Sequence, residues 1–241
     1  MSAVTGDRAP ARPSRRRILH LRQETIESMF GYAYTILMTD LLLVLANLPL
    51  AVLLFVSRDA LQAWPTVLLL SLTLAPSLAG AFEVFRRMRG EEPPRPFAAF
   101  WHGYRSRGGA AALLGLVTAL VIGFVLYDGA ILTGTVWAPL LAPTLAVVAA
   151  WAMATCTSAL AGLVLYPQVS VRAIVKAAVY LSVRRWYFSV FALVLLGISA
   201  AAVIVQPVLG ALVPGLLLYV VFANAEFAFR RAVEAEIAGT A

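Results

Sequence analysis

Six long apolar stretches constrain the fold of this chain more than any other feature of its sequence. They lie at about 34–56, 65–84, 110–127, 138–165, 187–205 and 208–225. A helix that crosses the hydrocarbon core of a bilayer needs roughly 20 predominantly apolar residues. Lipid offers the backbone no hydrogen-bond partners, and the stretches show no alternating strand pattern. The sequence therefore predicts an all-α fold, a polytopic membrane bundle with six transmembrane helices and cytoplasmic interfacial helices.

The composition agrees with a membrane protein. Hydrophobic residues make up 61% of the 241 residues and charged residues 13%, with a mean hydropathy of +0.86. A soluble domain carries about 25% charged residues. The single cysteine, Cys156, excludes an intramolecular disulfide and a cysteine-rich metal site.

The basic residues are distributed unevenly between the two sides of the predicted bundle. Six lie before the first span, six in 85–109, four in 166–186 and two after the last span, whereas Arg58 is alone on the opposite side. Cytoplasmic connections carry an excess of Lys and Arg. This distribution of 18 against 1 predicts that both termini are cytoplasmic. It also explains the net charge of +7 without a nucleic-acid partner.

Three regions follow from these patterns: a disordered Arg/Pro-rich tail (1–16), the membrane domain (17–231) and a C-terminal cytoplasmic tail (232–241). Two cytoplasmic segments, 17–33 and 168–183, have one apolar helical face each. In 168–183, Arg172 and Lys176 lie opposite that face. Such helices suit an interface rich in anionic lipid head groups. A simple extension of the next span into the cytoplasm is an equally good interpretation.

No catalytic motif is present. His20 and His102 have no partner at metal-ligand spacing, and the chain contains no G-x-S-x-G, no H-E-x-x-H and no phosphate-binding glycine loop. Cys156 lies in the middle of a span, where a buried small hydrophobe is expected. We therefore expect no enzymatic activity, no cofactor and no metal.

Polar groups at membrane depth are the first candidates for a functional site, because they are costly there. Asp40 and Asn47 lie in the first predicted span, and Pro76 interrupts the second. Asp40 has no local basic partner, so it must pair across the bundle, stay protonated or face water. Together Asp40, Asn47 and Pro76 form a candidate intramembrane polar site, although ordinary helix kinks would also explain Asn47 and Pro76.

Two other acidic residues have local partners that explain them. Glu83 precedes Arg86 and Arg87 by about one helical turn, and Glu226 precedes Arg230 by four residues. We expect ion pairs within these helices.

The connection between the second and third spans carries the second candidate site. Phe97, Phe100, Trp101 and Tyr104 fall at helical i, i+3, i+4, i+7 spacing, followed by Arg105. One interpretation is an interfacial helix that anchors its aromatic face in the bilayer. The other is a docking surface for a second protein, in which case changing Trp101 and Tyr104 to alanine abolishes association and leaves membrane insertion intact.

The order of these features resembles the YesL-type bacterial membrane proteins, a family of unknown function. The resemblance begins at MFGYAYTI (29–36) and continues through APSLAGAFEVFRR (75–87) and FAAFWHGYR (97–105). It extends through LYPQVSVRAIVKAAVYLSVRRW (165–186) to YVVFANAEFAFRR (219–231). A longer connection around 57–64 and the Arg/Pro-rich tail depart from the pattern.

The resemblance implies a protein of the bacterial cytoplasmic membrane. It also implies an accessory role beside a carbohydrate ABC transporter, with the permease or ATPase as partner, because genes of the family often adjoin such systems. The chain itself shows no transport-ATPase site. Two alternatives remain open: a stand-alone solute carrier with a polar site at Asp40 and Asn47, and a structural lipid-interacting protein. The sequence indicates no oligomeric state.

Overall fold

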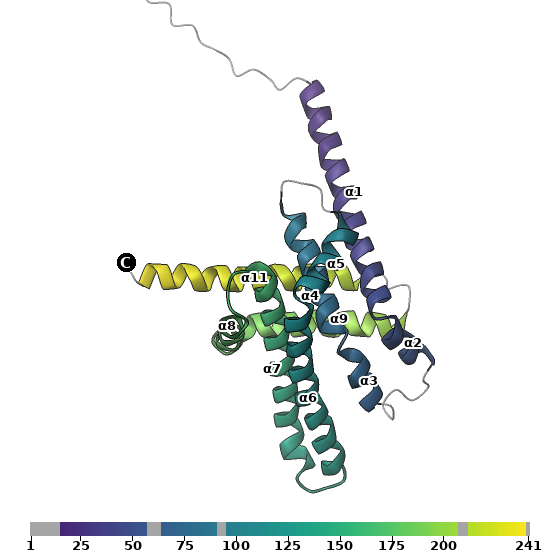
Figure 1. The fold of residues 1–241 in the computed structure, drawn as a ribbon, viewed down its shortest axis with the longest axis vertical. Coiled ribbons are helices and arrows are strands. Elements are labelled where there is room, and N and C mark those ends of the chain that lie inside the picture. The colour runs from purple at the N-terminus through teal and green to yellow at the C-terminus, as the bar shows by residue number, and fades with distance from the viewer. Residues whose placement is uncertain (1–14, 57–63, 91–94, 207–211, 240–241) are drawn as a thin grey trace, which may run out of the picture. The chain divides into compact units, whose positions relative to one another are not determined.

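The computed structural model describes residues 15–56, 64–90, 95–206 and 212–239 (Figure 1). Every regular element in these ranges is an α-helix. By its contacts the chain divides into two units, of which the first ends at Tyr34 and the second begins at Thr35. The boundary falls inside the long helix α1, Arg15–Ala46. In the first unit, Phe30, Tyr32 and Tyr34 expose their side chains. The fold described below is that of the second unit.

The remaining helices follow in chain order. They are α2 (Leu48–Val56), α3 (Trp64–Ser71), α4 (Leu74–Met88), α5 (Pro96–Ser106), α6 (Gly108–Leu132), α7 (Ala138–Leu165), α8 (Val171–Arg184), α9 (Trp186–Val205) and α11 (Pro214–Gly239). Of the predicted disordered tail 1–16, residues 1–14 lie outside the described residues and Arg15 and Arg16 begin α1. Helix α11 continues through most of the predicted C-terminal tail.

Four helical segments of the described chain are long and apolar enough to cross a membrane: Pro65–Met88, Gly108–Leu132, Ala138–Leu165 and Trp186–Val203. They correspond to the second to fifth predicted spans. A shorter apolar helix, Phe30–Ala46, covers part of the first. Part of the sixth predicted span, 208–225, lies outside the described residues. These segments identify a membrane protein, and the described residues support four of the six predicted spans.

Helices α6 and α7 form a hairpin and lie side by side (Figure 1). The turn between them needs a glycine, because Gly134 has φ of 83° and Thr135 N donates to Leu132 O at 3.0 Å, as in a type II turn. Helix α6 has 25 residues, which makes it about 38 Å long. It is therefore longer than the predicted 110–127 and exceeds the hydrocarbon thickness of about 30 Å.

The core of the second unit surrounds α4. This helix packs against α5, α6, α7 and α11, and the side chains of Phe82, Phe85 and Val84 are fully buried. Phe82 and Phe85 contact Phe222 of α11, with ring centroids 5.4 and 6.3 Å apart. The connection between the second and third predicted spans is thereby held next to the last helix.

The prediction that 168–183 contains a helix with one apolar and one basic face is confirmed. Ile174, Ala178 and Leu181 of α8 are buried, while Arg172 and Lys176 are exposed. The apolar face packs on α7, where Ile174 approaches so closely that a Cβ at Gly162 would lie 2.8 Å from its Cγ2. The apolar face of α8 therefore covers protein.

Candidate functional site

Helix α5 is fixed to α4 by two glycines that allow close backbone approach. A Cβ at Gly80 would lie 2.9 Å from the carbonyl oxygen of Phe100, and one at Gly103 would lie 2.6 Å from Cβ of Glu83. Real Cβ atoms do not approach other atoms so closely, so both positions exclude a side chain unless the helices move apart. Helix α5 is consequently packed tightly against α4.

The residues at the two ends of α5 explain where the helix begins and ends. Pro96 occupies its first turn after an extended Arg95 (φ −88°, ψ 95°), where the missing N–H leaves no bond unmade. Arg107 ends α5 by donating its backbone N–H to Gly103 O at 3.1 Å. Helix α6 then starts at Gly108. The packing of α5 on α4 and this short connection to α6 together set the orientation of α5.

The predicted aromatic face of α5 divides between the core and the surface. Phe100 is fully buried, so it belongs to the core and not to an external docking surface. Trp101 and Tyr104 are half-buried and pack on that core. Phe97 is 56% exposed. The periodicity had placed all four rings on one face, and α4 covers the part of that face nearest Phe100.

Three residues of α5 remain in a row on its exposed side: Phe97, Trp101 and Arg105, here named the α5 strip. The rings of Phe97 and Trp101 lie 6.3 Å apart, and the Arg105 guanidinium carbon lies 6.0 Å from the Trp101 ring centroid. Beside the strip is an open hollow of about 460 Å³, lined by Ala98, Trp101, His102, Arg105 and Ser106. Indole, imidazole and guanidinium groups together suit an aromatic or carboxylate side chain of a partner.

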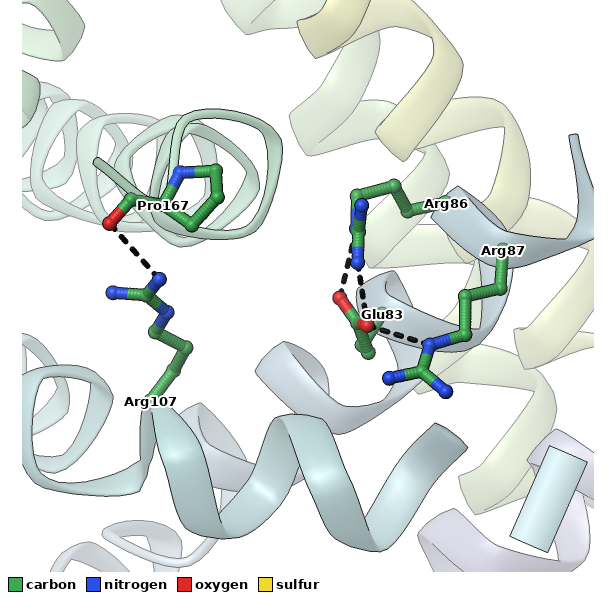
Figure 2. A network of polar contacts seen from close by, with 5 residues as sticks. All are labelled: Glu83, Arg86, Arg87, Arg107 and Pro167. Atoms are coloured by element: carbon green, nitrogen blue, oxygen red, sulfur yellow. Dashed lines mark hydrogen bonds and ion pairs between the residues drawn. The ribbon is translucent and has the colours of Figure 1, made fainter. Parts of the chain in front are cut away.

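Two buried carboxylates hold the arginines around this region. Glu83 accepts from Arg86 and Arg87, each at 2.7 Å, and lies between their side chains (Figure 2). This confirms the local pairs predicted from the sequence. Arg107 reaches a different partner and donates to the carbonyl of Pro167 at 3.0 Å (Figure 2).

The second carboxylate, Glu226 of α11, pairs with Arg230 at 2.6 Å, as predicted, and also with Arg89. The Arg89 guanidinium carbon lies 5.4 Å from the Tyr219 ring centroid and 5.9 Å from that of Phe222. Arg89 thus ties the end of α4 to α11. No sequence pattern signalled this pair, because its members are 137 positions apart.

Asp40, the first predicted polar residue at membrane depth, is buried against the start of α11. Its Oδ1 accepts the backbone N–H of Gly215 at 2.5 Å, and its side chain is 1% exposed. Its Oδ2 has no hydrogen-bond partner in the described part of the chain. The first N–H groups of a helix lack intrahelical acceptors and carry partial positive charge. Asp40 therefore acts as a tertiary cap for α11.

Asn47 joins two interrupted helices. Its Nδ2 donates to Ser77 Oγ and to Leu43 O, both at 2.8 Å, and its Oδ1 accepts from Thr73 Oγ1 at 2.8 Å. Asn47 itself separates α1 from α2, and Thr73 lies between α3 and α4. The amide thus satisfies polar groups at both breaks.

Pro76 explains the second break. It lies in the first turn of α4 and is buried. Because it has no N–H, it cannot continue the helical hydrogen bonding of α3. The chain instead makes hydrogen bonds between residues three positions apart, from Leu72 N to Leu69 O and from Thr73 N to Leu70 O, each 3.3 Å. The structure brings Asn47 next to the Pro76 turn, whereas Asp40 contacts α11.

Sequence reasoning missed Thr73, Ser77, Gly80, Gly103 and Gly215. Hydroxyl residues and glycines are common in membrane helices, so their types carried little signal. For Gly103, its place within the predicted aromatic helix was a usable indication, since glycine in a helix interior is unfavourable unless packing requires it. In the described ranges no group of three or more His, Cys, Asp or Glu residues could hold a metal ion.

Comparison with known proteins adds a family and nothing more specific. Neither the curated proteins nor the solved structures gave a match to the chain. Residues 36–129, which run from α1 through α6, match the model of the family described as "Protein of unknown function, DUF624". Residues 36–129 are thus similar to a family of unknown function, which is consistent with the YesL-type resemblance of the sequence.

Proposed function

We propose that this protein is a non-catalytic accessory or regulatory partner of a carbohydrate ABC transport system, with the α5 strip as its docking surface. The observation that carries the proposal is that α5 is exposed on one side and packed tightly against α4 on the other. Phe97 and Arg105 are exposed, and glycine contacts fix their helix to α4. A surface that is ordered before binding loses little conformational entropy on association. Tryptophan and arginine are also the residues that contribute most to protein interfaces.

The choice of partner rests on the YesL-type resemblance, and the arrangement of charges is compatible with it. Helix α5 connects two of the candidate spans, Pro65–Met88 and Gly108–Leu132. The same connection carries six of the basic residues that define the predicted cytoplasmic side. A component of a transporter on that side, either its permease or its ATPase, would meet the α5 strip.

The proposed topology has six spans with both termini in the cytoplasm of a bacterial cell. We expect a cysteine at position 136, in a background with Cys156→Ala, to react with a membrane-impermeant maleimide on intact spheroplasts. Val136 is 93% exposed in the α6–α7 turn. A cysteine in place of Lys176, which is exposed on α8, should react after permeabilisation only. Labelling of position 176 in intact spheroplasts would invert the topology.

If the α5 strip is a docking surface, a partner protein should co-purify with the wild type and be lost when the strip is changed. Purification from native membranes in mild detergent should enrich a sugar permease or its ATPase, identified by mass spectrometry. The Phe97→Ala/Trp101→Ala variant should lose most of that partner. Each such anchor contributes about 2 kcal/mol or more at an interface, which corresponds to about a thirtyfold loss of affinity per anchor.

A matched control separates docking from anchoring in the membrane. Phe124→Ala removes an aromatic side chain that is 61% exposed on α6, and it should retain the partner. Membrane-fraction yield should be equal for all variants if the strip docks a protein. Reduced insertion of the Phe97→Ala/Trp101→Ala variant would favour the lipid anchor, and a solitary wild-type protein would contradict the proposal.

A stand-alone solute carrier is the second candidate, favoured by the buried Asp40 whose Oδ2 has no partner among the described residues. If Asp40 instead caps α11, its substitutions should change the stability of the protein. Asp40→Ala should lower the free energy of unfolding by about 0.5–2 kcal/mol, as loss of a helix cap does. Asp40→Asn retains an acceptor for Gly215 N and should lower it much less.

Thermal unfolding in detergent measures both Asp40 variants. Solute uptake by liposomes containing the purified protein, abolished by Asp40→Asn at unchanged stability, would support the carrier instead. Equal destabilisation by alanine and asparagine would contradict the capping role.

A further inference from the structure

A largely apolar cavity, partly open at its edge, lies among the helices of the second unit, separate from the α5 strip. Its volume is about 450 Å³. Residues of α3, α4, α6, α7, α9 and α11 line it, including Leu78, Ile122, Met153, Leu160, Leu196 and Leu218. Helices α4, α6 and α7 lie in full within the candidate membrane spans. Helix α9 lies within one up to Val203, and α3 lies within one from Pro65 onward. The cavity is therefore at the depth where the surrounding medium is hydrocarbon.

The polar atoms in the cavity wall are already bonded to their own helices. Thr118 donates its hydroxyl to Leu114 O at 2.9 Å, Thr157 to Met153 O at 2.8 Å and Ser199 to Leu195 O at 2.9 Å. Ser71 likewise donates to Leu68 O at 2.7 Å. None of the described residues that line the cavity is charged. A sugar or an ion would lose its hydration there without full replacement, which is strongly unfavourable.

A second hollow adjoins this wall on the outer surface of the helices. It has a volume of about 360 Å³ between α3 and α6 and shares Leu68 and Ala119 with the cavity. Leu69, Leu120 and Phe124, which also line this outer groove, are 66%, 65% and 61% exposed. In a membrane these exposed side chains face lipid tails. The side chains of Leu68 and Ala119, which line both hollows, then separate the lipid from the cavity.

We propose that the cavity holds one hydrocarbon chain of a membrane lipid, which enters laterally through the outer groove. Apolar cavities of about 150 Å³ already bind small hydrocarbons, and ligand sites commonly measure about 300–1,000 Å³. The cavity and the groove are both apolar and are separated by the side chains of Leu68 and Ala119, which line both. Lipid tails are the apolar molecules present at high concentration on the outer surface. The occupant is thus a lipid tail and not a transported polar solute.

The test uses full-length protein in nanodiscs that contain a phospholipid with a photoactivatable group near the end of one acyl chain. After illumination, mass spectrometry should find the lipid attached to cavity residues such as Thr118, Cys156 and Leu196. Ala119→Phe places a ring at the shared wall and should reduce these attachments several-fold. Val147→Phe, a matched change at a position 66% exposed on α7, should leave them unchanged.

The chain's single cysteine allows a second measurement that does not depend on the Ala119→Phe variant. Cys156 lines the cavity, so a small fluorophore attached to it should be quenched by lipids brominated on the acyl chain and not by aqueous iodide. Quenching by iodide would show a water-filled cavity and overturn the proposal. Attachment confined to the outer surfaces of α6 and α9, and unaffected by Ala119→Phe, would overturn it equally.

Discussion

Replacing Gly103 by valine is expected to lower the free energy of unfolding by about 1–3 kcal/mol, the usual effect of overpacking a core. A Cβ at this position would lie 2.6 Å from Glu83 Cβ, 3.0 Å from Ala79 O and 3.1 Å from Gly80 Cα. Two of these three atoms are backbone, which cannot rotate away. Helix α5 must therefore move off α4, and the α5 strip moves with it. Unfolding by SDS titration of the purified protein measures the loss of stability.

Gly109→Val is the matched control for this change. Gly109 is also a helical glycine, on α6, and a Cβ there would meet no atom within 4 Å. Valine should therefore change stability by less than about 1 kcal/mol, in the range of helix propensities. Because α5 carries the proposed docking surface, Gly103→Val should also reduce recovery of the partner, whereas Gly109→Val should not. Equal unfolding midpoints for the two variants would contradict the close approach of α4 and α5.

Glu226→Gln is expected to have the second large effect, because Glu226 neutralises two arginines from different helices. The glutamate side chain is 7% exposed, and those of Arg89 and Arg230 are 36% and 68% exposed. Breaking a fully buried pair costs about 3–5 kcal/mol. Solvent around the arginines screens part of this, so we expect a loss of about 1–3 kcal/mol. Unfolding of the purified variant under the same conditions measures it.

The two arginines should contribute unequally. Arg230 is largely exposed, so Arg230→Gln should lower stability by no more than about 1 kcal/mol. Arg89→Gln should have a larger effect, because Arg89 also stacks on Tyr219 and Phe222. In a double-mutant cycle, Glu226→Gln and Arg89→Gln together should destabilise less than the sum of the single changes. Simple additivity would contradict a direct Arg89–Glu226 interaction.

The sequence was sufficient to predict most of the helices and the local ion pairs. Length and hydropathy located the segments from Pro65 to Val203, and i, i+3 or i, i+4 spacing predicted the pairs of Glu83 and of Glu226 with Arg230. These features depend on neighbouring positions along one helix. Helix α8 was predicted for the same reason, through the alternation of its apolar and basic faces.

Features that depend on two distant helices could not be predicted. In a chain with 61% hydrophobic residues, an apolar face matches lipid and protein equally well, so nothing in the spacing of Phe97, Phe100 and Trp101 indicated that Phe100 is the buried one. The partner of Asp40 is a backbone N–H 175 positions away, and a backbone donor has no sequence signature. The hydrogen bonds of Asn47 with Ser77 and Thr73 could not be predicted either, because Ser and Thr commonly bond within their own helix.

The central claim is that the α5 strip contacts a protein, and site-specific photo-crosslinking tests it most directly. A photoreactive phenylalanine analogue replaces Phe97 in the full-length protein, in cells grown on the sugar whose transporter is the suspected partner. A second variant carries the analogue in place of Phe124, which is similarly exposed on α6. We expect a covalent product with a permease or ATPase subunit from position 97 and lipid adducts from position 124. Lipid adducts from both positions would contradict the account and make α5 a membrane anchor.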